Sequence, residues 1–419
     1  MKTIHPLLLF SPFLFMYILL ILYLQQETYQ GDEERYMMFA ENLLQGYYSP
    51  PNELNLWNGP GYPLFLVPFV FFEAPLLAIK LCNAFFLYAS VILLFHAVKR
   101  VCNVAYARFF AFAWAIYYVA WQTLPLILTE TISILLIALS IYFIVNSYVD
   151  NKNKDKILAG LSLGFLALTK VIFGYVILCT LLLLFLAKLI RFLGKKQYDN
   201  RAITILLFAL TPLLPYLFYT YQLTGKPLYF ADSGGMSLYF MSTPYEGEFG
   251  DWNTPNFMGY CDGGIQPCNA PFFLKNHKEE IEYIYAVEGV ARDERFKAIA
   301  IENIKNHPIK FLRNCLANQG RMWFRYPFSF RFQNDLYLGI AFPNAVLFTL
   351  FLYMLLFWLL NFLKITKALN LIFLLLMIYL GGSTLLSAYP RQLYVVVPMI
   401  LILVSFALYR STNIQFRIQ

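Results

Sequence analysis

The sequence predicts an all-α protein that crosses a membrane many times, and three observations lead to this fold class. Hydrophobic residues make up 59% of the 419 residues and charged residues only 13%, about half the charged share of a soluble domain. Apolar runs of roughly 20 residues, the length that crosses a hydrocarbon core of about 30 Å, recur along nearly the whole chain. The short loops between these runs are alternately rich and poor in Lys and Arg. The bilayer is therefore the expected solvent for most of the chain.

The apolar runs predict about ten membrane-spanning helices. We place them at residues 6–24, 75–98, 105–123, 127–148, 156–175, 176–193, 202–222, 336–362, 369–387 and 393–410. No small-residue cleavage pattern follows the first run, so we expect an uncleaved anchor rather than a signal peptide.

Basic residues mark every second short loop. They are Lys99, Arg100 and Arg108, then Lys152, Lys154 and Lys156, then Lys195, Lys196 and Arg201, then Lys364 and Lys367, and finally Arg410 and Arg417. Because Lys and Arg in short loops stay on the cytoplasmic side, these loops and both termini are expected in the cytoplasm. This placement accounts for much of the net charge of +8, so we expect no nucleic-acid partner.

Two longer segments then lie on the external side of the membrane. We divide the chain into an N-terminal transmembrane module with the first external loop (1–222), an external, periplasmic loop with helices (223–335) and C-terminal transmembrane helices (336–419).

The first external loop contains an amphipathic pattern that predicts a surface helix. Its apolar residues at helical spacing are Tyr36, Phe39, Ala40, Leu43 and Leu44. Its polar face is expected to carry Glu34, Arg35, Glu41, Asn42 and Gln45, and Gly46 to end it. Such a helix is expected to lie on the membrane with its apolar face down. A second half-buried segment, 61–72, is too short to span the membrane alone.

The second external loop is expected to be irregular first and helical later. The stripe of Phe296, Ile299, Ala300 and Ile304 predicts a helix that ends at the His307-Pro308 pair, and another helix follows as far as Trp323. Cys261 and Cys268 bracket a short Gly- and Pro-containing stretch, which suits a small disulfide-closed loop in an oxidising compartment, with two free thiols as the alternative.

Six charged residues lie at the external ends of the expected spans: Asp32, Glu33, Lys80, Glu130, Lys170 and Arg391. Charges at membrane depth are costly, so they are usually functional or paired. A carboxylate can act as a general base toward a hydroxyl group, and Lys and Arg can bind a phosphate. Together they predict a site that binds a phosphate and activates a nucleophile.

Five of these residues also have a plain structural explanation. Asp32 and Glu33 can cap the helix that follows, and Glu130 can be an acid in the first turn of its own helix. Lys80 and Lys170 can extend their ammonium groups toward the membrane interface without binding anything.

The order of several motifs resembles the polyprenyl-phosphate-dependent membrane glycosyltransferases of the C-type fold. A first span followed by GDEERYMMFAENLLQG and WNGPGYPLFLVPF is similar to the start of bacterial relatives of the protein O-mannosyltransferases and of the lipid A aminoarabinose transferases. LTE at 128–130, GLSLGFLALTK at 160–170, FKAIAIENIKNHPIKFL and the terminal YPRQLYVVVPMILIL agree in order. The resemblance is weak at 225–290, where members of this family differ most.

This resemblance implies a function and a role for each candidate residue. The protein would transfer a single sugar, a hexose or a pentose, from a polyprenyl-phosphate donor to a lipid, glycan or protein hydroxyl, with inversion, and 1–222 would be the catalytic module. Asp32 would be the base, Glu33 would shape the site, and Glu130 would be the second external acid. Lys170 and Arg391, and more weakly Lys80, would bind the donor phosphate. The active site would face the periplasm of a bacterial inner membrane.

The implied chemistry requires no cofactor. Lys and Arg can neutralise a lipid monophosphate leaving group, and no D-x-D motif of the kind used with nucleotide sugars is present. Some related enzymes bind a divalent metal, so a metal remains open.

Two other functions fit parts of the pattern. A polymerase or ligase that moves oligosaccharides from lipid diphosphates would use arginines of the second external loop, namely Arg313, Arg321, Arg325 and Arg331. A lipid or glycan transporter would place its charges near the membrane midplane, on broken helices within repeated halves, whereas the charges here gather at one face.

Overall fold

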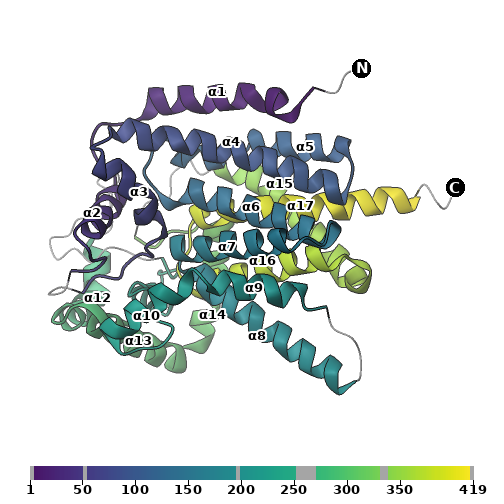
Figure 1. Ribbon diagram of the computed structural model, residues 1–419. Helices are drawn as coiled ribbons and strands as arrows, with labels where there is room; N and C mark the ends of the chain where they lie inside the picture. Colours follow the sequence, from purple (N-terminus) through teal and green to yellow (C-terminus); the bar gives the residue numbers. More distant parts are fainter. Residues whose placement is uncertain (1–3, 51–53, 195–198, 252–269, 331–337, 416–419) are drawn as a thin grey trace.

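The computed structural model describes residues 4–50, 54–194, 199–251, 270–330 and 338–415. Every regular element in these ranges is a helix, as the sequence predicts. Figure 1 shows long helices that run side by side, with both chain termini at one end of the bundle. Helices of the two expected external segments gather at the opposite end. The chain is thus an all-α, polytopic membrane protein whose irregular connections concentrate at one end.

Seven helices in the described residues are long and apolar enough to cross a membrane. They are α1 (Pro6–Leu24), α4 (Leu76–Val101), α6 (Thr129–Val149), α8 (Ile172–Leu193), α15 (Leu338–Asn361), α16 (Lys367–Leu385) and α17 (Pro390–Gln415). The bent pair α9 (Arg201–Leu210) and α10 (Leu213–Thr224) raises the number to eight if it counts as one span. The expected number of ten is therefore not confirmed.

The run at 105–123 is not one continuous helix. Helix α5 (Val104–Ala115) starts at an Asn103 cap, and the chain then forms the short 3-10 helix η1 (Tyr118–Thr123). The break is stabilised because the carbonyl of Ala115 accepts hydrogen bonds from the Tyr17 hydroxyl at 2.7 Å and from the Trp121 indole at 3.2 Å. These side chains replace the intrahelical donors that a longer helix would supply.

Two other expected spans also have different bounds. Helix α7 (Asn153–Thr169) ends six residues earlier than the expected 175, because Lys170 has extended backbone, and α8 begins at Ile172. The run at 202–222 bends by 48° between α9 and α10, where Pro212 lacks the amide that would continue the helix. A hydropathy pattern predicts neither break, because the residues on both sides of each break are apolar.

The first external segment folds against the bundle. Helix α2 (Glu33–Leu44) packs against α3 (Gly61–Phe71), the predicted half-buried segment. Most of the apolar face of α2 is buried by protein, with Phe39 and Ala40 fully covered and only Leu44 of this face exposed, so the expected placement of the whole face on lipid is wrong. Asn42 is also buried instead of lying on the polar face, because its amide donates to the carbonyl of Tyr48 at 3.2 Å.

The second external segment is helical over most of its described part. It contains α11 (Gly234–Met241), α12 (Ala270–Tyr285), α13 (Gly289–Asn306) and α14 (Pro308–Phe324). The boundary between α13 and α14 at the His307-Pro308 pair is confirmed. Phe240, Phe273, Phe296 and Phe330 form a small core of this segment, separate from the main core. Cys261 and Cys268 lie outside the described residues.

Helix α17 occupies the centre of the bundle. Of its apolar membrane-length window, 83% is buried, a larger share than in any other candidate span of the described residues. It packs against α4, α5, α6, α15 and α16. The first turn of this central helix carries Arg391, so the packing of the whole bundle determines where Arg391 lies.

Candidate functional site

Asp32 lies between two arginines from distant parts of the chain. Its Oδ1 accepts a hydrogen bond from Arg35 Nη2 at 2.6 Å, and its Oδ2 accepts one from Arg391 Nη1 at 3.2 Å. All three side chains are partly exposed, by 28% for Asp32, 29% for Arg35 and 37% for Arg391. Asp32 precedes the first turn of α2 but makes no capping hydrogen bond with its side chain. The Asp32 carboxylate therefore binds the two arginines and does not cap the N-terminus of α2.

The two arginines lower the proton affinity of Asp32. Burial alone raises the pKa of this carboxyl group, but the positive charges of Arg35 and Arg391 and their hydrogen bonds outweigh it. The result is a pKa below the ordinary value of 3.8. Asp32 is thus ionised at neutral pH and has both oxygens in use.

A second ion pair lies deeper in the protein. Lys170 Nζ lies 2.9 Å from Glu130 Oε1, and the side chains are 14% and 3% exposed. Glu130 is in the first turn of α6, and Lys170 follows the last residue of α7. Among the described residues, the buried Oε2 of Glu130 has no hydrogen-bond partner. Lys170 is paired, so the alternative that it only extends toward the membrane interface is wrong.

Arg391 and Tyr36 connect the two ion pairs. Glu130 and Asp32 are both close enough to interact electrostatically with the guanidinium of Arg391. Tyr36 of α2 is buried and interacts with the same three charged groups and with Arg35. Burial raises the pKa of its hydroxyl, so Tyr36 remains protonated. The described structure thus brings α2, α6, the α7–α8 junction and α17 together at one charged cluster, defined here as Asp32, Arg35, Tyr36, Glu130, Lys170 and Arg391.

Two glycines of the WNGPG stretch allow α3 to lie against the end of α7. A Cβ on Gly59 would be 2.1 Å from the carbonyl oxygen of Leu168, and a Cβ on Gly61 would be 2.6 Å from Thr169 Oγ1. No other residue type fits at such distances. The contact fixes the end of α7 directly before Lys170, and the ring of Tyr62 packs edge-on against Tyr36 with centroids 5.2 Å apart.

Glu33 does not face the arginines. It is fully buried, and its two carboxylate oxygens accept hydrogen bonds from the backbone amides of Ile127 at 2.9 Å and Gln30 at 3.0 Å. These bonds tie the start of α2 to the turn before α6. The two acidic residues expected to act together therefore have different positions. Asp32 belongs to the charged cluster, whereas Glu33 is buried and holds two backbone segments together.

Lys80 is also apart from the charged cluster. It is fully buried in α4, and its Nζ donates a hydrogen bond of 2.6 Å to the carbonyl of Gln26. This bond holds the chain that leads from α1 to Asp32. Lys80 neither extends to the interface nor joins the cations around Arg391.

Sequence reasoning missed Arg35 and Tyr36. The amphipathic pattern predicts Arg35 on the exposed polar face of its helix and Tyr36 on the apolar face. The available signal for Arg35 was its spacing, because residues three apart on a helix are neighbours and Asp32 is three residues before it. Arg35 is anchored by the Asn58 side chain at 2.8 Å and by the ring of Trp57, 5.5 Å from its guanidinium carbon.

The arginines of the alternative ligase hypothesis are dispersed. Arg321 is fully buried, Arg313 is exposed on α14, and Arg325 caps α14 in a left-handed conformation with φ of 60°. Arg331 lies outside the described residues. No group of three or more His, Cys, Asp or Glu side chains that could hold a metal ion occurs within the described ranges.

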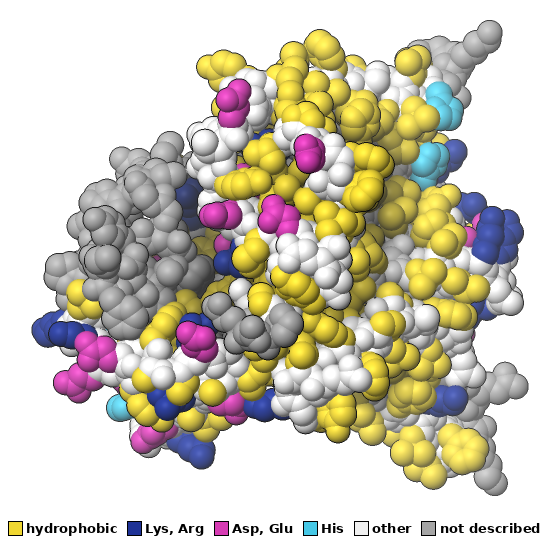
Figure 2. Space-filling view, turned by 60° about the vertical axis from the view of Figure 1, so that its left-hand side comes forward, with side chains coloured by type: hydrophobic (Ala, Val, Ile, Leu, Met, Phe, Trp, Pro, Cys, Tyr) yellow, Lys and Arg dark blue, Asp and Glu magenta, His cyan; other side chains and the backbone are white. Residues whose placement is uncertain are grey.

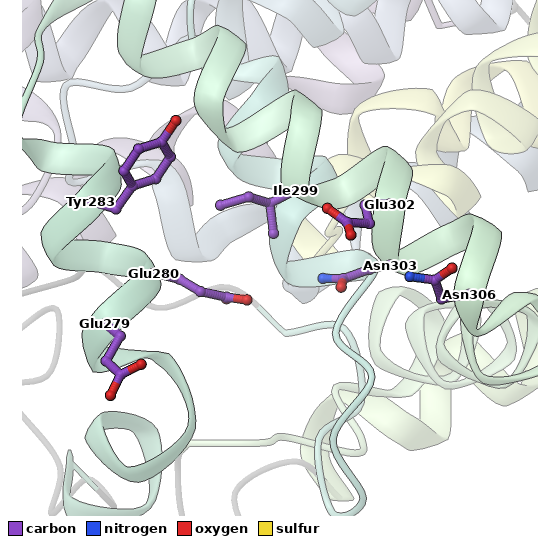
Figure 3. Close-up of a pocket in the computed structure, with 7 residues that line it drawn as sticks. All are labelled: Glu279, Glu280, Tyr283, Ile299, Glu302, Asn303 and Asn306. Carbon is purple, nitrogen blue, oxygen red and sulfur yellow. The ribbon is translucent and has the colours of Figure 1, made fainter.

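The surface separates into polar ends and an apolar middle. In Figure 2, hydrophobic side chains cover a broad band, and charged side chains gather toward the ends. A hollow of about 420 Å³ lies between α12 and α13. Figure 3 shows the residues that line it, Glu279, Glu280, Tyr283, Ile299, Glu302, Asn303 and Asn306. None of these residues belongs to the charged cluster.

No protein-family model matches the chain, and no curated protein sequence matches it. Among solved structures it is similar to the Archaeoglobus fulgidus oligosaccharyltransferase tethered with an acceptor peptide, with a TM-score of 0.46 and 13% identity over 95% of this chain and 49% of that one. The chain spans about half the length of that structure.

The chain is also similar to ArnT from Cupriavidus metallidurans bound to undecaprenyl phosphate, with a TM-score of 0.41 and 13% identity over 96% of this chain and 78% of that one. For the Archaeoglobus fulgidus AglB in complex with an inhibitory peptide and a dolichol-phosphate, the TM-score is 0.47 and the identity 15%, over 95% of this chain and 50% of that one. Solved structures of the expected kind are thus similar to this chain. The similarity lies in the arrangement of helices and says nothing about the activity.

Proposed function

We propose that this chain is a membrane glycosyltransferase that moves a single sugar from a polyprenyl-phosphate donor to an acceptor hydroxyl. The observation that carries the proposal is the charged cluster itself. A carboxylate and two separate cations, Arg391 and Lys170, lie together at one end of a bundle of apolar helices. Transfer from a lipid phosphate needs a base for the acceptor, positive charge for the phosphate and an apolar surface for the lipid tail.

In the proposed reaction the acceptor oxygen attacks the anomeric carbon, and the bond from that carbon to the phosphate oxygen breaks with inversion. The leaving phosphate keeps the electron pair, and its negative charge is neutralised by Arg391 and Lys170. Asp32 accepts the acceptor proton, which becomes acidic as the new bond forms. The chain supplies these charges without a cofactor, and the choice of hexose or pentose and of acceptor rests on residues outside this cluster.

The donor phosphate competes with Asp32 for Arg391 in this scheme. When Arg391 turns to the phosphate, Asp32 loses one of its two cations, so its proton affinity rises. The base is then strongest when the donor is bound. Glu130 keeps Lys170 in place and places a second negative charge beside Arg391.

The alternating basic loops support an external, periplasmic location for the charged cluster in a bacterial inner membrane. Glu130 begins α6, whereas the basic loop after Val149 lies at the other end of the same helix. Both termini would then be cytoplasmic. A transporter is less well supported, because the bent pair α9–α10 contributes none of the residues of the charged cluster.

The proposal is tested by replacing Asp32 with Asn. We expect a deletion strain and its Asp32→Asn complement to lose the same single sugar from the cell-envelope lipids or glycans, as measured by mass spectrometry. Removal of a general base lowers the rate by about 10²–10⁴-fold. Asp150→Asn is the matched control, since Asp150 also pairs with an arginine, Arg100 at 3.0 Å, but at the other end of the bundle. Full restoration of the sugar by Asp32→Asn would contradict the assignment of the base.

A further inference from the structure

The segment between α16 and α17 is held by one asparagine of α14. Asn318 is fully buried, and the two N–H groups of its Nδ2 are shared among three carbonyl oxygens, those of Ser383 at 2.9 Å, Thr384 at 3.1 Å and Leu386 at 2.7 Å. Its Oδ1 accepts the backbone amide of Ala388 at 2.8 Å. These carbonyls end α16 and have no further helical turn to bond to, so one side chain replaces a missing turn.

Arg321, one turn further along α14, holds the same segment. Its Nε donates to the carbonyl of Ala388 at 3.2 Å, and its Nη2 donates to Asn318 Oδ1 at 2.8 Å. The remaining donors bond to the carbonyls of Phe249, Gly250 and Pro327 at 3.1, 2.9 and 3.3 Å. All five N–H groups of this fully buried guanidinium are in use. Arg321 therefore has no donor left for a diphosphate leaving group, which argues against the ligase hypothesis at this residue.

Ala388 is fixed at both its amide and its carbonyl, and Arg391 is three residues after it. Tyr389, between them, donates its hydroxyl to Asp251, and its amide is held by Gln392 Oε1 at 2.8 Å. The backbone entering α17 is thus determined before Arg391 is reached. The Arg391 side chain starts from this fixed backbone, is 37% exposed and pairs with Asp32 at 3.2 Å.

We infer that Asn318 and Arg321 are positioning residues, which place Arg391 against Asp32 by holding residues 383–389 to helix α14. The inference rests on the proposed function in one respect only. The effect on donor binding follows only if Arg391 binds the donor phosphate, as proposed. It assigns to α14, a helix of the second external segment, the task of orienting a cation on a membrane-spanning helix. Because Arg321 also bonds to residues 249–250, the position of that external stretch is coupled to the position of Arg391.

The coupling is measured with a double-mutant cycle in lipid nanodiscs. The ligand is undecaprenyl phosphate, and the variants are Asn318→Ala, Arg391→Gln and their combination. We expect each single change to weaken binding about tenfold, in the usual range for coupled residues. The double variant should bind about as weakly as Arg391→Gln alone, since Asn318 acts only through Arg391. Additive losses would overturn the inference.

Asn314→Ala is the matched control. Asn314 is one turn before Asn318 on the same helix, is equally buried, and donates to the carbonyls of Met241 and Thr243 at 3.0 Å each. Asn314→Ala therefore removes buried hydrogen bonds from the same helix without touching residues 383–389. We expect its effect on binding to be small and additive with Arg391→Gln.

Hydrogen exchange separates the inference from the proposed function. Asn318→Ala should speed exchange at Ala388 and in the first turn of α17, and Asn314→Ala should not, whether or not any lipid binds. Absence of undecaprenyl phosphate binding by the unchanged protein would contradict the proposed function, while the exchange data would still decide the positioning role. If Asn318→Ala does not fold, Arg321→Lys serves instead, because one ammonium group reaches fewer carbonyls, and unchanged exchange at Ala388 in that variant would overturn the inference.

Discussion

At the residue scale, the character of Asp32 is set by its two arginines. A carboxylate with one guanidinium on each oxygen has a low pKa and an unfavourable geometry for taking a proton. In the proposed reaction the same arrangement becomes productive when a phosphate draws Arg391 away, because the carboxylate is then exposed, oriented by Arg35 and more basic. Under that proposal, the ion pair is the state of the site before the donor binds.

Replacing Arg391 with Gln is expected to shift the acidic limb of the activity profile to higher pH. In the unchanged protein the Asp32 pKa lies below 3.8, so the base stays ionised to low pH. Loss of one cation raises that pKa in the donor-free protein, so kcat/KM should fall at a higher pH than before. The measurement is kcat/KM as a function of pH, because this ratio reports the ionisation of the free protein. A lower kcat/KM with an unmoved acidic limb would mean that Arg391 does not control Asp32.

The sequence indicated part of the charged cluster and missed the rest for a physical reason. Asp32, Glu130, Lys170 and Arg391 could be found because charges in an apolar chain are few and the topology places them at one end. The different roles of Asp32 and Glu33 could not be predicted from the sequence. The two residues are adjacent at the start of a helix, and the direction of each side chain is settled only after α2 has docked. The carbonyl of Gln26 that binds Lys80 carries no signal in the sequence at all.

At the scale of elements, two close contacts between helices position the charged cluster. One is made by α3 against the end of α7, and the other by α14 against the segment before α17. Both contacts use features that a hydropathy pattern does not contain, namely glycines without a Cβ and an amide side chain that replaces a helical turn. The lengths of most helices followed from apolar runs, whereas the breaks at Ala115, Lys170 and Pro212 depended on local hydrogen bonds and on proline.

Gly61→Ala is expected to reduce both stability and donor binding. The new methyl group would overlap Thr169 Oγ1 and the Thr169 amide, at 2.6 and 2.7 Å, and overpacking of this kind costs about 1–3 kcal/mol. Thr169 is adjacent to Lys170, so the ion pair with Glu130 should be displaced. Thermal unfolding and undecaprenyl phosphate binding would measure the two effects.

Gly381→Ala is the control for this change. Gly381 lies inside α16, and no atom lies within 4 Å of the place that the added methyl group would take. Alanine should therefore be tolerated and should favour the helix by up to about 1 kcal/mol. If Gly61→Ala binds the lipid as the unchanged protein does, the contact between α3 and α7 does not position Lys170.

The core of the second external segment is expected to respond to pH through His277. This buried residue of α12 lies 2.9 Å from Glu248 Oε2 and 2.7 Å from the Tyr239 hydroxyl, with Glu280 at 3.8 Å. Burial lowers its pKa, but the bonds to Glu248 and Glu280 outweigh this, so the pKa lies above 6.5. The resulting stabilisation is fully present below pH 6.5 and is lost as the pH rises through the folded-state pKa.

His277→Gln tests this expectation through the melting temperature. The difference between the unchanged protein and the variant should be largest below pH 6.5 and should shrink as the pH is raised. His307→Gln, at the exposed junction of α13 and α14, is the control for loss of a histidine outside this buried core. A difference for His277→Gln that is constant with pH would show that the histidine does not carry the charge.

At the scale of the whole molecule, the charged cluster depends on pieces that are far apart in the chain. Asp32 and Arg391 are separated by 359 positions, and α17 reaches its place only when the entire bundle has packed around it. The sequence could predict a polytopic helical fold because hydropathy is a strong and local signal. It could not predict the number of spans, because three of the ten apolar runs end or bend inside the bundle.

An experimental structure with bound undecaprenyl phosphate tests the central claim most directly. We expect the phosphate to lie within ion-pair distance of Arg391 and Lys170, with Asp32 released from Arg391 and still held by Arg35. The lipid tail should follow the apolar band away from that end of the bundle. Phosphate density at Arg313 or Arg325, with the Asp32–Arg391 pair intact, would contradict the account.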